Sequence, residues 1–318
     1  MQKTALGTTG FEIVPLVFGG NVFGWTIDEK TSFSILDAFI DHGFDAIDTA
    51  DVYSIWAPGN QGGESETIIG HWLKTKPAMR DKIKLFTKVG DDLKIPGHKG
   101  LSEKWITQAV EDSLRRLQTD YIDLYFSHWP DDSTPYEETL GAYEKLLKAG
   151  KVRSVGASNL NVDQLNQSLT VAKQHTLPAY QVLQPEYNLY DREGFNADLQ
   201  GLCVRENIGV VTYYSLASGF LSGKYRSVQD LSKSARGDGI GKYLDQKGQG
   251  ILKLLDEISA RHQAQPAEVA LAWLIGEKAV TAPIASATKT AHIESFAKAM
   301  SVRLSSEEHQ QLTDAGLV

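Results

Sequence analysis

Four polar side chains in the sequence have the types and positions needed for acid–base chemistry. Asp48, Tyr53, Lys88 and His128 each lie at or just beyond the end of a short apolar run. A tyrosine has an ordinary pKa of about 10, so it gives up its proton poorly at neutral pH. We expect the Lys88 ammonium to lower that pKa by favouring the phenolate, and the Asp48 carboxylate to keep the ammonium charged and oriented. A neutral His128 would hydrogen-bond the substrate oxygen.

Two different reactions are open to these four residues. The set supplies a proton but no electron pair, so a reduction requires a bound cofactor. Alternatively, Lys88 beside Asp48 could form a Schiff base in a barrel lyase or isomerase that needs no cofactor. Taken singly, each residue also has an ordinary structural role in capping, packing or the solvated surface. Their joint occurrence at the ends of apolar runs favours a catalytic role.

The elements that carry these residues alternate between strand and helix patterns. Amphipathic stretches such as residues 28–42 and 102–117 separate eight short runs of apolar or β-branched residues. This alternation is typical of parallel strands joined by helical crossovers, and eight such units favour an α/β fold of the closed (β/α)8 TIM barrel type over an open sheet. A capping box at residues 305–308 predicts an extra C-terminal helix. The predicted strands are residues 13–19, 44–48, 83–88, 121–127, 152–158, 180–184, 209–215 and 280–286.

We interpret residues 1–318 as a single domain, because barrels of this length commonly form one and no linker or repeat interrupts the chain. In a parallel barrel the functional groups lie at the C-terminal ends of the strands. Polar residues end or follow every predicted strand, and packing alone explains this poorly. These residues are Asn21, Asp48, Lys88, His128, Ser158, Gln184, Tyr214 and Ser286.

The charge and the cysteine content restrict the possible partners. A formal net charge of -8 offers no positive field for nucleic acid or anionic lipid. Cys203 is the only cysteine, which excludes an intramolecular disulfide and a cysteine-based metal cluster. The sequence has no apolar secretory leader, no apolar stretch of membrane length and no His, Asp and Glu set with zinc-ligand spacing. We therefore expect a cytoplasmic protein without a metal, nucleic-acid or membrane partner, of undetermined oligomeric state.

Several segments resemble the aldo-keto reductase family. FDAIDTADVY at residues 44–53, LFTK at 85–88 and YIDLYFSHWP at 121–130 are similar to its three catalytic segments. The order and spacing of these segments make the resemblance specific, and it extends from about Leu6 to the C-terminus. It implies a barrel plugged at the bottom by an N-terminal β-hairpin, here residues 3–6 with 11–13. It also implies hydride transfer between a nicotinamide and a carbonyl or alcohol, with Tyr53 as the proton donor.

The resemblance also implies a cofactor site that needs no Rossmann G-x-G-x-x-G motif, and the sequence contains none. GASN at residues 156–159 is similar to the family's site for the nicotinamide carboxamide, and QPEYNL at 184–189 to its sixth-strand segment. YYSLASGFLSGKY at residues 213–225 is similar to the loop that covers the pyrophosphate and stacks an aromatic ring on the nicotinamide. The residues expected to bind the cofactor are Gly20, Asn21, Asp48, Ser158, Asn159, Gln184, Tyr214, Ser215, Leu216, Ala217, Gly219, Leu221, Lys224, Ser286, Thr288, Lys289 and His292.

The segment after the eighth strand departs from the family pattern. The family usually places basic and amide side chains there, and they hold the adenosine 2′-phosphate and the adenine. Ser286, His292 and Phe296 occupy the corresponding positions in this sequence. Because Lys289 could still reach a phosphate, we expect NADP as the cofactor, with NAD or dual use as the alternative.

Aromatic residues near the rim are candidates for the substrate wall. Trp56 lies in a glycine-rich insert at residues 54–66, Trp129 follows His128 directly, and Phe23 and Trp25 follow the first strand. These rings could equally cover the barrel mouth. We expect a small carbonyl or alcohol substrate, an aldehyde, ketone or sugar that the sequence does not identify. A regulatory subunit of the potassium-channel β type is an alternative, which the lack of an extension before the barrel disfavours.

Overall fold

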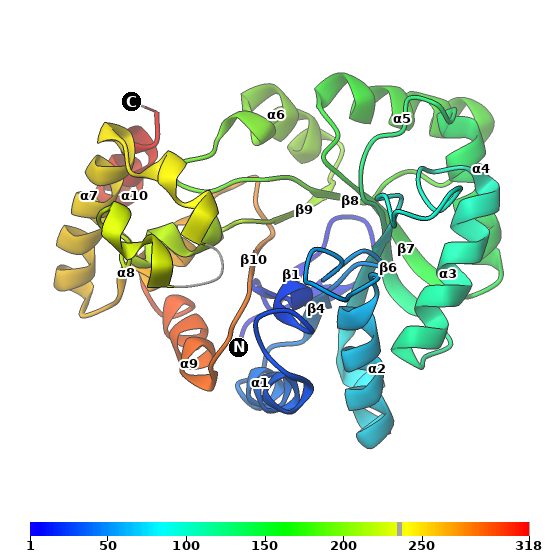
Figure 1. The fold of residues 1–318 in the computed structure, drawn as a ribbon. Coiled ribbons are helices and arrows are strands. Elements are labelled where there is room, and N and C mark those ends of the chain that lie inside the picture. The colour runs from blue at the N-terminus through cyan, green and yellow to red at the C-terminus, as the bar shows by residue number, and fades with distance from the viewer. Residues whose placement is uncertain (234–236, 318) are drawn as a thin grey trace.

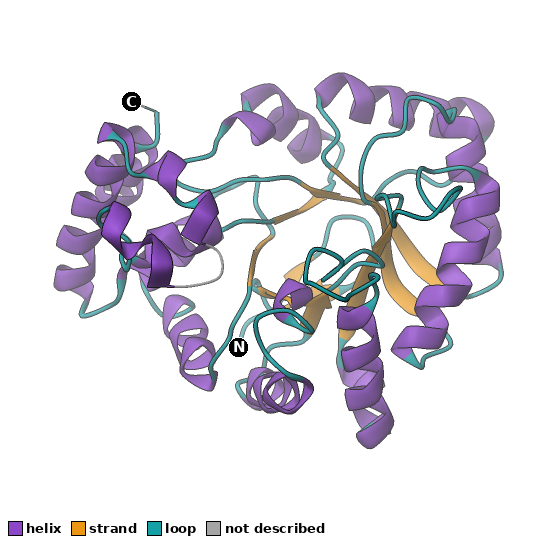
Figure 2. Ribbon diagram, viewed as in Figure 1, coloured by secondary structure: helices purple, strands orange, loops and turns teal. Residues whose placement is uncertain are grey.

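The computed structural model describes residues 1–233 and 237–317. Its centre is a closed barrel of parallel strands in the order β10-β3-β4-β5-β6-β7-β8-β9, with helices around it (Figures 1 and 2). This arrangement confirms the predicted (β/α)8 barrel. The strands are β3 (Val17–Gly19), β4 (Ala46–Asp48), β5 (Lys84–Val89), β6 (Ile122–Ser127), β7 (Val152–Ser158), β8 (Val182–Gln184), β9 (Gly209–Thr212) and β10 (Ala282–Ala285).

A two-stranded hairpin precedes the barrel, as the resemblance implied. Strands β1 (Thr4–Ala5) and β2 (Glu12–Ile13) pair antiparallel, and Leu6 and Ile13 pack fully buried against the residues inside the barrel. The predicted strand over residues 13–19 was therefore too long, because Ile13 belongs to the hairpin. The chain turns between the two elements, where the Asp45 carboxylate accepts a hydrogen bond from the backbone of Val14.

The helices follow the predicted pattern and begin at capping residues. The Asp28 side chain caps the first helix, and Ser305 forms a capping box with Glu308 at the start of the last, which confirms the predicted C-terminal helix. Among the described residues no helix combines the length and apolarity needed to cross a bilayer. The α-helices are α1 (Glu29–Asp41), α2 (Glu64–Thr75), α3 (Glu103–Leu117), α4 (Tyr136–Lys148), α5 (Val162–His175), α6 (Ala197–Arg205), α7 (Gln246–His262), α8 (Pro266–Gly276), α9 (Thr290–Ala299) and α10 (Ser306–Ala315).

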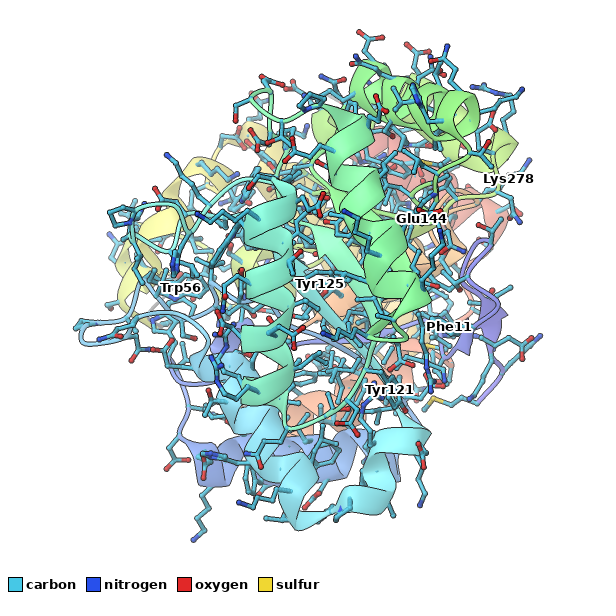
Figure 3. The ribbon with its side chains drawn as sticks, turned by 90° about the vertical axis from the view of Figure 1, so that its right-hand side faces the viewer. Phe11, Trp56, Tyr121, Tyr125, Glu144 and Lys278 are labelled. Carbon is cyan, nitrogen blue, oxygen red and sulfur yellow. The ribbon has the colours of Figure 1, made fainter. Side chains whose placement is uncertain are left out.

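The core has two parts, one between the strands and the helices and one inside the barrel. Close packing inside the barrel explains Gly156 on β7: a Cβ atom there would lie 2.6 Å from the Phe126 ring. In Figure 3, Trp56 and Phe11 lie on opposite sides of the molecule with Tyr125 between them. Because Phe11 adjoins the hairpin, the rim that carries Trp56 is the one at the C-terminal ends of the strands.

The chain leaves the barrel early after β9. The predicted strand over residues 209–215 ends at Thr212, because Tyr214, Ala217 and Ser218 adopt left-handed backbone angles with φ of 51°, 48° and 57°. A short 3-10 helical segment (Ala217–Ser222) includes the last two of these residues and is kinked at Ser218 and Gly219, whose backbone angles are not helical. The loop is thereby folded across the rim instead of extending the strand.

Candidate active site

Lys88 is the centre of a buried hydrogen-bonded cluster at the rim. Its strand, β5, lies beside β4, and Asp48 ends β4. The Lys88 Nζ atom donates to Asp48 Oδ2 at 2.6 Å, to the Thr49 carbonyl at 2.8 Å and to the Tyr53 hydroxyl at 2.9 Å. The side chains of Lys88 and Asp48 are each only 1% exposed, so water does not compete for this ion pair. The structure thus brings three of the predicted catalytic residues into direct contact.

Asp48 is held by further donors. The Gln184 side chain, from the end of β8, donates to Asp48 Oδ1 at 3.0 Å, and the Tyr53 hydroxyl donates to Oδ2 at 3.3 Å. Both carboxylate oxygens are therefore satisfied, which fixes the orientation of the group that pairs with Lys88. Gln184 was expected only as a cofactor ligand, and its contact with Asp48 adds an anchoring role.

His128, the fourth predicted catalytic residue, faces the same space. Its ring centroid lies 6.0 Å from that of Tyr53, and its backbone carbonyl accepts a hydrogen bond from the Asn159 side chain at 3.0 Å. Burial lowers the pKa of His128 well below its ordinary value, and the nearby Lys88 charge lowers it further. The imidazole is therefore neutral at pH 7, as the sequence analysis expected.

The pKa of Tyr53 shifts opposite to the sequence prediction. Desolvation raises the pKa of Tyr53 well above its ordinary value, and the neighbouring Asp48 carboxylate raises it further. Burial also lowers the pKa of Lys88, against the opposing effect of Asp48. The expectation that Lys88 lowers the pKa of Tyr53 was therefore wrong for the protein without bound ligand. Desolvation of the phenolate outweighs the attraction of the Lys88 cation, which is already paired with Asp48. Tyr53 consequently keeps its proton at neutral pH.

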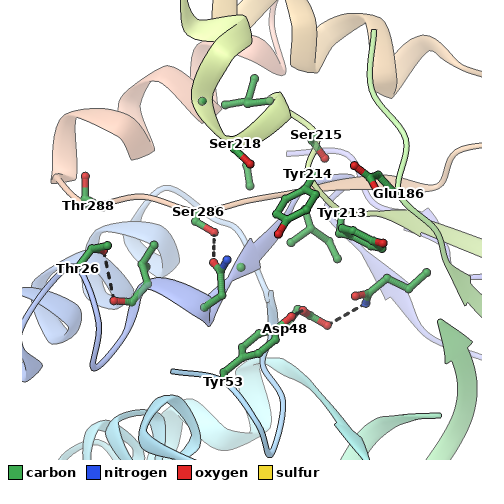
Figure 4. Close-up of a pocket in the computed structure, with 18 of the residues that line it drawn as sticks. Thr26, Asp48, Tyr53, Glu186, Tyr213, Tyr214, Ser215, Ser218, Ser286 and Thr288 are labelled. Carbon is green, nitrogen blue, oxygen red and sulfur yellow. Dashed lines mark hydrogen bonds between the residues drawn. The ribbon is translucent and has the colours of Figure 1, made fainter. Parts of the chain in front are cut away.

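A cavity of about 940 Å³ extends from this cluster across the rim to the end of β10. Figure 4 shows Tyr214 and Ser286 across it from Asp48 and Tyr53. Most residues expected to bind the cofactor line it, whereas Gly20, Ala217 and Leu221 are buried behind it and Lys289 lies exposed beside it. The expected residues that line the cavity are Asn21, Asp48, Ser158, Asn159, Gln184, Tyr214, Ser215, Leu216, Gly219, Lys224, Ser286, Thr288 and His292.

Hydrogen bonds fix the polar residues at the middle of the cavity. The Tyr213 hydroxyl donates to Asn159 Oδ1 at 2.8 Å, and Ser158 donates to the Gln184 carbonyl at 2.7 Å. Asn159 adopts a left-handed φ of 63°, which asparagine tolerates better than most residues. The Tyr214 ring is 47% exposed and offers a flat apolar face beside these amides. Amide groups next to an open aromatic face fit the carboxamide and ring of a nicotinamide.

Positive groups gather at the opposite end of the cavity. Lys224 and Lys289 are close enough to His292 to lower its pKa, in addition to the effect of burial. The backbone N–H of Thr288 donates to His292 Nδ1 at 3.2 Å, which orients the ring. Two lysines close to one histidine would be stabilised by a bound anion, so this end of the cavity fits the phosphates of a dinucleotide.

Three of the four predicted substrate-wall residues line the same cavity. Trp56 and Trp129 are 46% and 44% exposed, and Trp25 packs edge-on against Trp56 with centroids 5.5 Å apart. Phe23 is the exception, because it is fully buried and stacks on Phe18 in the core. Phe23 and Trp25 are separated by one residue, and the sequence gave no indication of which ring faces the cavity.

The cavity also contains residues that the sequence analysis missed. Asp91, Glu186 and Tyr213 line it. Asp91 lies three residues after Lys88, just beyond the end of β5, so the rule that polar residues follow strands could have found it. At the end of β5 only Lys88 was predicted as a functional residue. Tyr213 was overlooked because its neighbour Tyr214 matched the family's stacking position.

The comparisons with known proteins identify the family. The aldo/keto reductase family model matches residues 15–316. The chain is 31% identical to "Probable aldo-keto reductase 1" of Glycine max, over 99% of this chain and 89% of that protein. It is 30% identical to "Aldo-keto reductase YhdN" of Bacillus subtilis (strain 168), over 98% and 92%. A "Probable voltage-gated potassium channel subunit beta" of Arabidopsis thaliana is 31% identical, over 95% and 92%.

The chain therefore belongs to the aldo/keto reductase family. Membership implies an NAD(P)-dependent oxidoreductase that acts on carbonyl compounds. The barrel, the buried Lys88 cluster and the elongated cavity described above are consistent with this class of enzyme.

Proposed function

We propose that this protein interconverts an aldehyde, ketone or sugar and the corresponding alcohol, with Tyr53 as the general acid and base. The observation that carries the proposal is the position of Lys88 Nζ, 2.9 Å from the Tyr53 hydroxyl and 2.6 Å from Asp48 Oδ2. A phenol hydrogen-bonded to a buried ammonium can release its proton and regain it without exchange with bulk water. Tyr53 and Asp48 line the cavity, and Lys88 lies buried against both of them.

In the direction of reduction, Tyr53 donates its proton to the carbonyl oxygen and forms the O–H bond of the alcohol. The raised pKa of Tyr53 ensures that this proton is present at neutral pH. The phenolate that remains is stabilised by Lys88, whose charge Asp48 maintains. Neutral His128 donates a hydrogen bond to the same oxygen and directs it toward Tyr53. A bound nicotinamide supplies the hydride that the protein itself cannot provide.

NADP is the proposed cofactor. Lys224 lines the far end of the cavity, Lys289 lies beside it, and both are close to His292, so this end can neutralise an added phosphate. The cavity-lining His292 stands where the family usually has an arginine or glutamine, and this substitution would make NAD a usable second cofactor. Ser158, Asn159 and Gln184 would hold the carboxamide, and Tyr214 would stack on the ring.

The test is a fluorescence titration of the purified protein with NADPH and NADH separately, followed by turnover with an aldehyde panel. We expect tighter binding of NADPH and a larger preference for it in His292→Arg, because the guanidinium adds a permanent charge beside the phosphate. Binding of neither nucleotide would contradict the proposal and favour the cofactor-free lyase. An unchanged NADPH/NADH ratio in His292→Arg would show that His292 does not face the phosphate.

A second candidate function is favoured by one comparison. The Arabidopsis thaliana relative is named as a potassium-channel subunit, and it is as similar to this chain as the Glycine max relative. A channel-associated subunit of this type would bind nucleotide but turn substrate over slowly. The same titration, combined with steady-state kinetics, separates the two functions, because only the reductase combines nucleotide binding with rapid turnover.

A further inference from the structure

Asp91 is a carboxylate in the lining of the cavity, at the end that contains Tyr53 and His128. We call this the carbonyl end. It follows β5 and lines both the catalytic cavity and a neighbouring cavity of about 1160 Å³. Its Oδ1 atom accepts a hydrogen bond from the Asp92 backbone at 2.7 Å, and its Oδ2 atom accepts one from the Trp129 indole at 3.1 Å. These two bonds fix the carboxylate at the wall, with its side chain 34% exposed.

Among the described residues no lysine or arginine forms an ion pair with Asp91, although Lys99 and Lys104 line the neighbouring cavity. The His128 Nδ1 atom lies 3.9 Å from Asp91 Oδ2, too far for a hydrogen bond. Burial lowers the pKa of His128, so this ring carries no charge at neutral pH. The nearby Lys94 pairs with Asp92 instead. Asp91 thus places a carboxylate beside His128 in the lining of the cavity that also contains Tyr53.

Cations are absent from this end of the cavity within the described parts of the chain. Lys224 is the sole Lys or Arg among the described lining residues, and it lies near His292 at the phosphate end. Lys88, behind Tyr53, already pairs with Asp48. The carboxyl group of Glu186 adds a further acidic group to the lining, although burial raises its pKa. A carboxylate or phosphate group on the substrate would therefore meet Asp91 without a compensating charge.

Aromatic side chains line the same cavity as Asp91. The Trp129 indole donates to the Asp91 carboxylate and its ring stacks near His128, with centroids 6.0 Å apart, while Trp56 and Trp25 form an edge-to-face pair in the lining. Flat apolar faces in the same cavity as the Asp91 carboxylate suit a substrate with an apolar body and a hydrogen-bond donor.

We propose that Asp91 selects the substrate class: a carbonyl compound with an apolar body that carries a hydroxyl or ammonium group as a donor to Asp91, with anionic carbonyl compounds disfavoured. This inference rests on the proposed reductase function. It identifies Asp91 as a specificity-determining residue that contacts the substrate away from the reacting atoms. Hydroxyl and ammonium groups can both donate a hydrogen bond to a carboxylate, but only the ammonium adds a positive charge. A matched series of substrates distinguishes the two.

The experiment compares four benzaldehydes of one shape with the purified protein and saturating nucleotide. They carry methyl, hydroxymethyl, (dimethylamino)methyl or carboxylate groups, each tested at the 3- and 4-positions. We expect kcat/KM to be highest for the two donor-bearing aldehydes and lowest for the carboxylate. A higher kcat/KM for the tertiary ammonium compound would show that its charge dominates recognition. A higher kcat/KM for the hydroxymethyl compound would show that hydrogen bonding dominates. Either order supports the proposal.

Asp91→Asn removes the charge with little change of shape. We expect it to lower kcat/KM for the ammonium substrate by about tenfold relative to the methyl compound, and to raise that for the carboxylate by a similar factor. Asp92→Asn is the matched control, because this neighbouring carboxylate lines only the second cavity. It should leave the order of the four substrates unchanged.

Three outcomes would overturn the inference. Similar rates for all four aldehydes in the unmodified protein would show that Asp91 does not discriminate. A uniform change across the series in Asp91→Asn would show that this residue acts through His128 and not on the substrate. An equal change of the substrate order in Asp92→Asn would show that the selectivity arises from the overall electrostatic field of the loop after β5. No turnover of any aldehyde in the wider panel with either nucleotide would instead refute the reductase function on which the inference rests.

Discussion

Replacing Lys88 with methionine removes a buried ammonium and leaves the Asp48 carboxylate without its cation. The two side chains are each 1% exposed, and Lys88 donates three hydrogen bonds of 2.6 to 2.9 Å. Gln184 and Tyr53 would remain as donors to Asp48, but neither carries a positive charge. Removing one partner of a buried ion pair typically costs about 3–5 kcal/mol of the free energy of unfolding, and we expect Lys88→Met to fall in this range.

Replacing both members of the ion pair avoids the cost of leaving one buried charge unpaired. Lys88→Met combined with Asp48→Asn removes both charges, so no carboxylate is left unpaired in the interior. We expect the double variant to be more stable than Lys88→Met alone, with a coupling energy of about 2–3 kcal/mol between the two sites. Lys84→Met is the matched control on the same strand, because the Lys84 ammonium only lies over the Phe11 ring, 5.3 Å from its centroid. It should cost less than about 1 kcal/mol.

The assay is urea-induced unfolding, monitored by circular dichroism at pH 7 and analysed by linear extrapolation. It compares the unmodified protein with Lys88→Met, Asp48→Asn, the double variant and the control Lys84→Met. Additive effects of Lys88→Met and Asp48→Asn would refute the view that the pair is the main stabilising contact of each residue. A cost for Lys88→Met no larger than that for Lys84→Met would show that Lys88 is solvated in the folded protein.

Three further predictions concern other parts of the molecule. Asp51 is buried, neither of its carboxylate oxygens accepts a hydrogen bond from the described residues, and burial raises its pKa well above the ordinary value. Because a raised folded-state pKa costs stability as the pH rises above about 4, Asp51→Asn should raise the melting temperature more at pH 7 than at pH 4; an equal gain at both would contradict this. The raised pKa of Tyr53 predicts that kcat/KM for reduction stays constant through neutral pH, and a decline centred near pH 7 in the rate profile would count against it. Gly156→Ala places a methyl group 2.6 Å from the Phe126 ring and should cost about 1–3 kcal/mol in urea unfolding, whereas an unchanged midpoint would mean that the ring moves aside.

Much of the fold followed from local patterns in the sequence. The predicted strand over residues 152–158 matches β7, and the capping box predicted at residues 305–308 begins its helix as expected. These features depend on residues close together in the chain, which is why pattern alone suffices. The predicted strand over residues 209–215 was too long because left-handed turns at Tyr214 and Ala217 end the pairing, and neither residue type signals such a turn.

The candidate site was predictable in membership but not in electrostatics. Tyr53, Lys88 and Asp48 lie in contact, but the direction of the Tyr53 pKa shift depends on how much water is excluded, which only the packed barrel determines. Phe23 and Trp25 are close in sequence, yet Phe23 packs in the core and Trp25 lines the cavity. Side-chain orientation in an irregular loop has no periodic signal, so the sequence could not separate them.

The central claim is that the Tyr53 phenol supplies the proton when the carbonyl is reduced. Tyr53→Phe keeps the ring beside Trp56 and removes only the oxygen that contacts Lys88 and Asp48. We predict that this variant binds NADPH with an unchanged dissociation constant in the fluorescence titration and that its kcat for aldehyde reduction falls by at least about 100-fold. Turnover at the rate of the unmodified protein, with nucleotide binding intact, would contradict the account.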